Sequence, residues 1–183
     1  ASYFHLLREH TYTRPRRPLI VFTPKQLLRL KAACSPVEAF TSGTFQPVIG
    51  ETDDAVLAAA RKQGVDRVLL CSGRVYYDLL AHRTKTGDTS TAIVRLEQLY
   101  PLESSAIAEA LAPFSGAELV WVQDEPANQG MWPYLALNLP TDLTGGVLPT
   151  LVSRPEAAAP AVGTAGLHRA QQEEILRQAF ARR

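Results

Sequence analysis

Three short apolar runs dominate the middle of the chain, and two helix-like segments separate them. The runs are Arg67–Cys71, Thr91–Leu96 and Glu118–Gln123, and helical periodicity covers Val75–Arg83 and Leu102–Leu111. Short β-branched runs that alternate with helical segments are typical of a parallel sheet with crossover helices. The pattern predicts an α/β fold. Because open α/β sheets bind ligands beyond the carboxyl ends of their strands, candidate chemistry is expected in the residues that follow each run.

Weaker patterns predict further elements on both sides of this centre. Before it, we expect a short helix around residues 3–7, a buried strand at Leu19–Phe22, a helix at Lys25–Ala33, a short strand within Phe45–Ile49 and a helix at Ala55–Lys62. After it, we expect a helix at Met131–Leu139, a strand at Leu148–Ser153, an irregular segment at Pro155–Gly163 and a helix at His168–Ala181. Ser104 or Ser105 is a suitable N-cap for the helix at Leu102–Leu111.

The first third of the chain is predicted to be an incomplete layer that completes a sheet lying upstream of Ala1. Between Cys34 and Asp54 the composition shifts to Ser, Thr, Pro and Gly without a sustained period, which is typical of a linker. We therefore predict an upstream domain tail at residues 1–34, a linker at 35–54 and a main domain at 55–183. The chain is expected to be a piece of a longer protein.

Composition favours an ordinary globular protein, with 46% hydrophobic and 20% charged residues. A formal net charge of +1 gives no electrostatic argument for a nucleic-acid or membrane partner, and no apolar run is long enough for a membrane span. The basic residues of the first third are interpreted as a solvated or interface face; they are Arg14, Arg16, Arg17, Lys25, Arg29 and Lys31. Cys34 and Cys71 are interpreted as small buried hydrophobes in a reducing, cytoplasmic compartment.

The tripeptide Ser72-Gly73-Arg74 follows the first central run, where a strand is expected to lead into a helix. A helix N-terminus with an adjacent arginine can bind a phosphate. Neither GxGxxG nor GxxxxGK is present, so a close turn with a surface arginine is the favoured interpretation.

The segment QDEPANQG follows the third run and contains two neighbouring acids, Asp124 and Glu125. Paired carboxylates can act as general acid and base when their environments separate their pKa values. The favoured alternative is a loop held by side-chain hydrogen bonds, with Gly130 in a conformation that other residues avoid. The four histidines are scattered, so the sequence predicts no metal site and no catalytic residue.

Several long segments together resemble the thiamine-diphosphate-dependent, decarboxylating first component of the 2-oxoglutarate dehydrogenase complex. They are FHLLR at 4–8, RRPLIVFTPKQLLRLKAA at 16–33, FQPVIGE at 45–51, CSGRVYYDLL at 71–80, AIVRLEQLYPL at 92–102 and VQDEPANQGMW at 122–132. The segments RPEAAAPAVG and HRAQQEEIL near the end also match. The resemblance covers essentially the whole chain and corresponds to the carboxyl-terminal end of that family.

The resemblance implies a transketolase C-terminal-like, mostly parallel sheet flanked by helices and preceded by the tail of a pyrimidine-binding domain. It implies an oxidoreductase of the tricarboxylic acid cycle that decarboxylates 2-oxoglutarate on thiamine diphosphate and Mg²⁺. The succinyl group would pass to the dihydrolipoyl succinyltransferase component, and the enzyme would be a cytoplasmic homodimer. The family's cofactor motif, its activating glutamate and its substrate histidines have no match in this sequence, so the piece alone is expected to be inactive. A related substrate such as 2-oxoadipate stays open.

Some members of this family bind acetyl-CoA or AMP through their carboxyl-terminal region. The resemblance makes Arg74, Gln129 and Arg154 candidate nucleotide contacts, because phosphate needs guanidinium or amide donors. Members that respond to acetyl-CoA resemble SRR where this chain has Ser153-Arg154-Pro155, so one arginine of that pattern is missing. The alternative function is a stand-alone scaffold or nucleotide-sensing module with the same fold.

Overall fold

The computed structural model describes residues 1–13 and 16–181, which form two compact units, 1–46 and 47–183. The boundary between these units falls inside the segment 35–54, for which the sequence predicts a linker. The finer division into 1–34, 35–54 and 55–183 remains a prediction.

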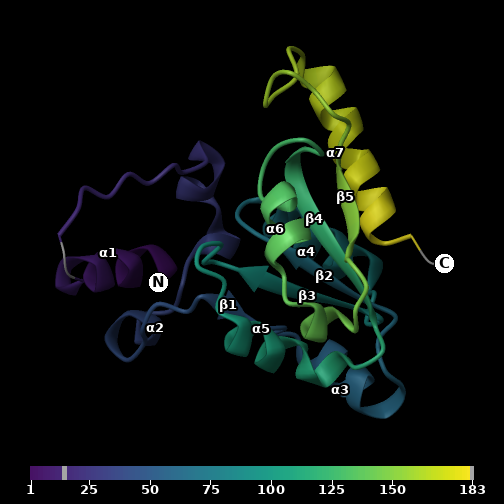
Figure 1. Ribbon diagram of the computed structural model, residues 1–183, viewed down its shortest axis with the longest axis horizontal. Helices are drawn as coiled ribbons and strands as arrows, with labels where there is room; N and C mark the ends of the chain where they lie inside the picture. The colour runs from purple at the N-terminus through teal and green to yellow at the C-terminus, as the bar shows by residue number, and fades with distance from the viewer. Residues whose placement is uncertain (14–15, 182–183) are drawn as a thin grey trace. The chain divides into compact units, whose positions relative to one another are not determined.

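The second unit is built on a five-stranded sheet with the strand order β1-β3-β2-β4-β5 (Figure 1). The strands are β1 (Val48–Ile49), β2 (Arg67–Cys71), β3 (Thr91–Leu96), β4 (Glu118–Pro126) and β5 (Thr150–Arg154). β1 pairs antiparallel with β3, and all other pairs are parallel. The predicted α/β fold with a mostly parallel sheet is therefore confirmed, and the architecture is that of a transketolase C-terminal-like domain. β4 continues beyond the predicted Gln123 to Pro126.

Helices follow the strands as the periodicity predicts. They are α3 (Asp54–Gln63), α4 (Val75–Thr86), α5 (Ser104–Leu111), α6 (Trp132–Asn138) and α7 (Ala165–Ala179), with short 3₁₀ helices η3 (Ala112–Phe114) and η4 (Thr141–Thr144). The prediction that Ser104 or Ser105 caps α5 is wrong. Glu103 occupies the N-cap position without a side-chain cap, and both serines lie within the first helical turn.

Side chains of the central strands alternate between two cores, one on each face of the sheet. Val68, Leu70, Val94 and Trp121 pack with α3, α5 and α6, whereas Leu69, Cys71, Ile93 and Val120 pack with α4 and α7. A parallel strand that is buried on both faces reads as a continuous apolar run, which explains why β2 was visible in the sequence. The sheet is thus the middle layer of three, and α7 runs beside β5 (Figure 1).

The first unit contains α1 (Ser2–Tyr12), the 3₁₀ helices η1 (Lys25–Arg29) and η2 (Lys31–Ala33), and α2 (Glu38–Thr41). Two predictions for this unit are wrong. The helix expected at Lys25–Ala33 is interrupted by the extended backbone of Leu30, which separates η1 from η2. The buried strand expected at Leu19–Phe22 is neither a strand nor buried, since Ile20 is 77% and Phe22 93% exposed. A strand needs a neighbour to complete its hydrogen bonds, and the described part of this unit contains no other strand.

The two cysteines differ in exposure, and the described basic residues of the first unit are exposed. Cys71 is buried as expected, but Cys34 is exposed because it follows η2 in a unit whose described residues include no buried apolar side chain. Arg14 lies outside the described residues. The other basic residues of this predicted face are exposed: Arg16, Arg17, Lys25, Arg29 and Lys31.

Candidate functional site

The turn after β2 brings an arginine to the carboxyl edge of the sheet. Gly73 has φ +69°, a left-handed conformation that glycine adopts without strain, and Arg74 occupies the N-cap position of α4. The Arg74 guanidinium donates to Asp78 at 2.6 Å, one helical turn further on, and to Asp124 at 2.7 Å, near the carboxyl end of the neighbouring strand β4. The turn therefore carries an arginine that is already paired with two carboxylates.

Arg154 closes the same edge from β5 and is only 6% exposed. Its Nε donates to the backbone carbonyl of Asp124 at 2.7 Å, and its terminal nitrogens donate to the side-chain oxygens of Gln171 at 3.0 Å and Gln172 at 2.8 Å. One Nη also lies 3.9 Å from the Asp124 carboxylate. The structure thus joins β4, β5 and α7 through one guanidinium.

Gln172 connects the two arginines. Its oxygen accepts from Arg154 and, at 3.4 Å, from Arg74, while its amide nitrogen donates to Asp78 at 3.0 Å. Burial raises the pKa of Asp78, although the positive charge of Arg74 opposes this shift. We call Arg74, Asp78, Asp124, Arg154 and Gln172 the edge cluster. Two guanidinium groups and two carboxylates balance in it, so an anion would have to displace Asp124 or Asp78 to reach an arginine.

The carboxyl end of β3 contributes no residue to the edge cluster and contains another arginine, Arg95. Its guanidinium lies 4.3 Å from the centre of the Tyr76 ring, a cation–π arrangement, and its Nε is 2.9 Å from a carboxylate oxygen of Glu97. The Nε–Glu97 contact lacks hydrogen-bond geometry, so it is electrostatic.

The loop after β4 is organised by the buried amide of Gln123. Its oxygen accepts from the Trp121 indole and from the Trp132 backbone, and its nitrogen donates to the carbonyls of Pro126 at 3.0 Å and Gln129 at 2.8 Å. Gly130 has φ +69°, and a Cβ there would meet the Gln123 amide at 3.1 Å. This role of Gln123 has no local sequence signal, because an amide inside a strand pattern does not reveal its hydrogen-bond partners.

Asp124 and Glu125 lie within β4, so the loop interpretation is wrong for the two acids; it holds for the residues that follow Pro126, where Gly130 has a positive φ. Asp124 is paired with Arg74, while Glu125 is exposed. Gln129 is a predicted nucleotide contact, yet its amide donates to the carbonyl of Ala157 at 2.8 Å. Asn128 bonds both polar groups of the Ala157 backbone, so the loop holds the irregular segment that follows Arg154.

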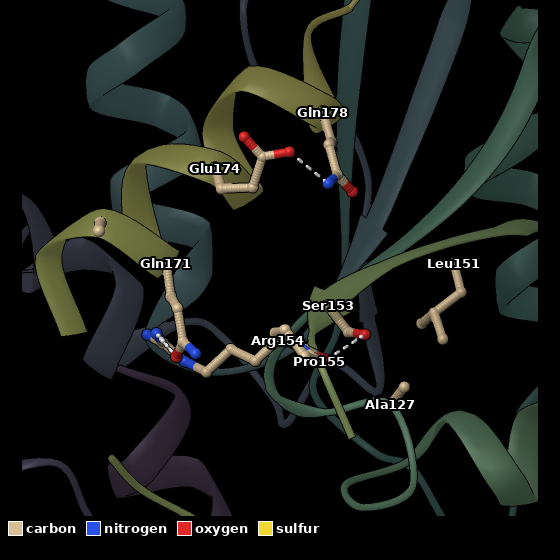
Figure 2. A pocket seen from close by; sticks show the side chains of 9 residues that line it. Ala127, Leu151, Ser153, Arg154, Pro155, Gln171, Glu174 and Gln178 are labelled. Atoms are coloured by element: carbon tan, nitrogen blue, oxygen red, sulfur yellow. Dashed lines mark hydrogen bonds between the residues drawn. The ribbon is translucent and has the colours of Figure 1, made fainter. Parts of the chain in front are cut away.

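A groove of about 460 Å³ lies between β5 and α7, next to the edge cluster (Figure 2). It is lined by Ala127, Leu151, Ser153, Arg154, Pro155, Ala170, Gln171, Glu174 and Gln178. Figure 2 shows Gln171 meeting Arg154 at one end and Glu174 bonded to Gln178 at the other. One of the predicted contacts, Arg154, lines this groove.

The structure brings two of the three predicted contacts together: Arg74 and Arg154 meet at Asp124, and Gln129 lies apart on Ala157. Sequence reasoning missed Asp78 and Gln172. Asp78 could have been found, because it stands four residues after Arg74 on a helix, whereas Gln172 carries no local signal. Within the described ranges, no three His, Cys, Asp or Glu side chains gather closely enough to hold a metal ion, and no helix could cross a membrane.

Fold and site define an α/β domain of the transketolase C-terminal type whose carboxyl edge is closed by ion pairs. The family model described as 2-oxoglutarate dehydrogenase C-terminal matches residues 34–180, and the chain belongs to this family. It is 44% identical over 185 residues to the multifunctional 2-oxoglutarate metabolism enzyme of Mycobacterium sp. (strain JLS), covering 99% of this chain and 14% of that protein. It is 42% identical over 183 residues to the 2-oxoglutarate dehydrogenase E1 component of Cupriavidus necator, covering 100% of this chain and 19% of that protein. The chain thus spans less than a fifth of the length of these relatives.

Proposed function

We propose that the chain is the non-catalytic, dimer-forming and regulatory end of an enzyme that decarboxylates 2-oxoglutarate on thiamine diphosphate. The whole enzyme would pass the succinyl group to the lipoyl arm of a dihydrolipoyl succinyltransferase, in a soluble complex of the cytoplasm. The observation that carries the proposal is the match of nearly the whole chain to one end of 2-oxoglutarate dehydrogenase E1 relatives.

The chemistry of the carboxyl edge supports a structural role. The charged groups of the edge cluster pair with one another and join β4 and β5 to α4 and α7. The described residues do not fit the Mg²⁺ that accompanies thiamine diphosphate, because no suitable group of acidic side chains comes together. The ligands of the cofactor and its metal would therefore lie in a part of the enzyme outside this chain.

The test compares the full-length protein with a version that ends at Cys34, both supplied with thiamine diphosphate and Mg²⁺. We expect the full-length protein to decarboxylate 2-oxoglutarate as a dimer and the shortened protein to lose both properties. Light scattering after size-exclusion chromatography measures the dimer, and release of CO₂ from labelled substrate measures the activity. The isolated 183-residue chain should show no turnover.

Three results would change the proposal. Full activity in the shortened protein would make this domain an appendage and favour the alternative, a stand-alone scaffold or nucleotide-sensing module. Turnover by the isolated chain would contradict its non-catalytic role. Activity of the full-length protein on 2-oxoadipate rather than 2-oxoglutarate would keep the role of this domain and revise the substrate.

A second candidate role is regulation by acetyl-CoA or AMP at Arg74 and Arg154. It is favoured by the meeting of both guanidinium groups at Asp124, beside the groove. Calorimetric titration of the full-length protein should give saturable heat that Arg154→Gln abolishes. Arg177→Gln is the matched control, because Arg177 lies on α7, the helix that packs against β5, but is 68% exposed and pairs with Glu174. Absence of heat with both nucleotides would remove this role for Arg74, Arg154 and Gln129.

A further inference from the structure

Helix α6 has no charged residue, although part of its surface faces solvent. Among the α-helices of the second unit that the structure describes, α3, α4, α5 and α7 each contain charged residues, whereas α6 contains none. A helix at the surface of a globular protein normally has charged residues on its outer face, and a helix that is apolar all round is normally buried. The outer face of α6 is therefore expected to be covered in the assembled protein.

The two faces of α6 have different surroundings. Leu135 is buried and Trp132 packs against the same core, so these residues fix the inner face of α6 on the sheet. Pro133 and Leu137 stand one helical turn apart on the outer face and are exposed, and Leu137 is 86% exposed. Packing of the second unit thus uses the inner face of α6 and leaves the outer face to solvent.

A tyrosine from another part of the chain extends this outer face. Tyr100 follows β3 and is 77% exposed, and its ring meets that of Tyr134 edge to face with 5.9 Å between the ring centres. Tyrosine is enriched in protein interfaces, because it offers a large contact area and loses few rotamers on binding. Asn138 is exposed on the same helix, and its amide donates to the Tyr134 carbonyl at 2.9 Å. We call Tyr100, Pro133, Tyr134, Leu137 and Asn138 the α6 patch.

The chemistry of the α6 patch is self-complementary. Residues 126–141 contain no Lys, Arg, Asp, Glu or His, and neither do residues 98–102 around Tyr100. Two copies of this patch can therefore meet without bringing like charges together. The polar side-chain groups of the patch are two tyrosine hydroxyls and one amide, and each of them both donates and accepts hydrogen bonds. Each group can therefore bond with the same group of a second copy.

We propose that the α6 patch is a contact between two copies of this protein related by a two-fold axis. The proposal rests on the dimer-forming role in the proposed function and names the surface that carries it. A two-fold contact uses the same patch on both partners, so it favours a neutral surface over one that needs an oppositely charged partner. A stable interface buries about 800 Å² on each partner, so the α6 patch would be the apolar centre of a larger contact.

The first test is photo-crosslinking of the full-length protein with p-benzoylphenylalanine in place of Leu137. After irradiation, we expect a band of twice the chain mass on a denaturing gel. Mass spectrometry of that band should join position 137 to α6 or to the segment around Tyr100. The matched control has the same replacement at Leu167, which is 50% exposed on α7, on the opposite face of the sheet. It should give no crosslinked dimer.

The second test measures the dimer affinity of full-length Leu137→Glu by light scattering over a dilution series. A carboxylate in the apolar centre of the contact should raise the dissociation constant about tenfold or more. Leu167→Glu adds the same charge on the other side of the sheet and should leave the dissociation constant unchanged. Equal weakening by Leu137→Glu and Leu167→Glu, or none by Leu137→Glu, would overturn the proposal.

The outcomes separate this contact from the proposed function. A dimer in light scattering without a crosslink between chains at position 137 would overturn the contact and leave the dimer-forming role intact. A crosslink confined to one chain would mean that another domain of the same chain covers the α6 patch, which also overturns the contact. A full-length protein that is monomeric would contradict both the contact and the dimer-forming role.

Discussion

Replacing Glu51 by alanine should open the centre of the sheet, because Glu51 and Arg83 form a buried ion pair. Their side chains are only 2% and 3% exposed. Both terminal nitrogens of Arg83 donate to the Glu51 carboxylate, which also accepts from the backbone N–H groups of Thr52, Asp53 and Ile93, each at 2.8 Å. Burial by itself would lower the pKa of Arg83, but its hydrogen bond with Glu51 and the charge of that carboxylate raise it.

The expected magnitude follows from the groups left behind. Removing one partner of a buried pair costs about 3–5 kcal/mol, since the other charge stays buried without compensation. At about 1.4 kcal/mol for each factor of ten, backbone amides of β2 and β3 should exchange with deuterium about 10² to 10⁴ times faster. Arg83→Met should have a smaller effect, because the carboxylate keeps its three backbone donors.

Hydrogen exchange of the full-length protein, followed by mass spectrometry of peptides from β2 and β3, measures this effect. Glu174→Ala is the control, since Glu174 pairs with Arg177 on the exposed side of α7. It should leave exchange in β2 and β3 unchanged. If Glu51→Ala accelerates exchange no more than Glu174→Ala does, the buried pair does not stabilise the sheet and the reasoning is wrong.

Three further predictions concern single residues. Gly130→Ala and Gly73→Ala both place a side chain at φ +69°, which costs about 1–2 kcal/mol. Only at Gly130 does the new Cβ meet neighbouring atoms, within 3.1 Å, so the melting temperature of Gly130→Ala should fall further than that of Gly73→Ala. Equal falls in melting temperature would contradict this. Burial raises the pKa of the Cys71 thiol, whereas Cys34 is exposed. Alkylation of the folded protein at pH 8 should therefore modify Cys34 and spare Cys71, as mass spectrometry of its peptides would show. Rapid labelling of Cys71 would contradict its burial in the core. Burial in the folded protein raises the pKa of Asp78 above its ordinary value of 3.8, so at pH values just above 3.8 the native state binds more protons at Asp78 than the unfolded state does. The contribution of Asp78 to stability therefore falls as the pH rises from 3.8 through the folded-state pKa, and Asp78→Asn should flatten this fall in thermal melts. An unaltered dependence of the melting temperature on pH would refute the raised pKa of Asp78.

The local pattern predicted the sheet and its helices well. β2, β3 and β4 were found because strands between two helical layers must be apolar on both faces, and such runs are visible without knowing their neighbours. The predictions of a turn at Gly73 and of an unusual backbone at Gly130 are also confirmed, since both residues have positive φ angles, which favour glycine.

Other features depended on neighbours that local pattern cannot supply. Leu19–Phe22 has the composition of a buried strand, yet it is exposed, since burial requires a second layer and not only apolar residues. Ser104 and Ser105 have side chains that can act as N-caps, but α5 begins at Ser104, so the N-cap position falls on Glu103. In both cases the residue types suit the predicted role, a buried strand or an N-cap, but the position of the residues relative to the rest of the fold does not allow it.

The sequence by itself determined the strands and helices of the second unit, because apolar periodicity depends on neighbours a few positions apart, and its long matching segments determined which family the chain resembles. Only the tertiary structure decided that Arg74 and Arg154 are neutralised by Asp124 and linked by Gln172, a residue 98 positions from Arg74. It also decided that a groove lies between β5 and α7. Parallel strands and packed helices bring segments that are distant in sequence together, and only then can their charges pair and their surfaces form a cavity. Electrostatic attraction and packing depend on distances in space, not on separation along the chain.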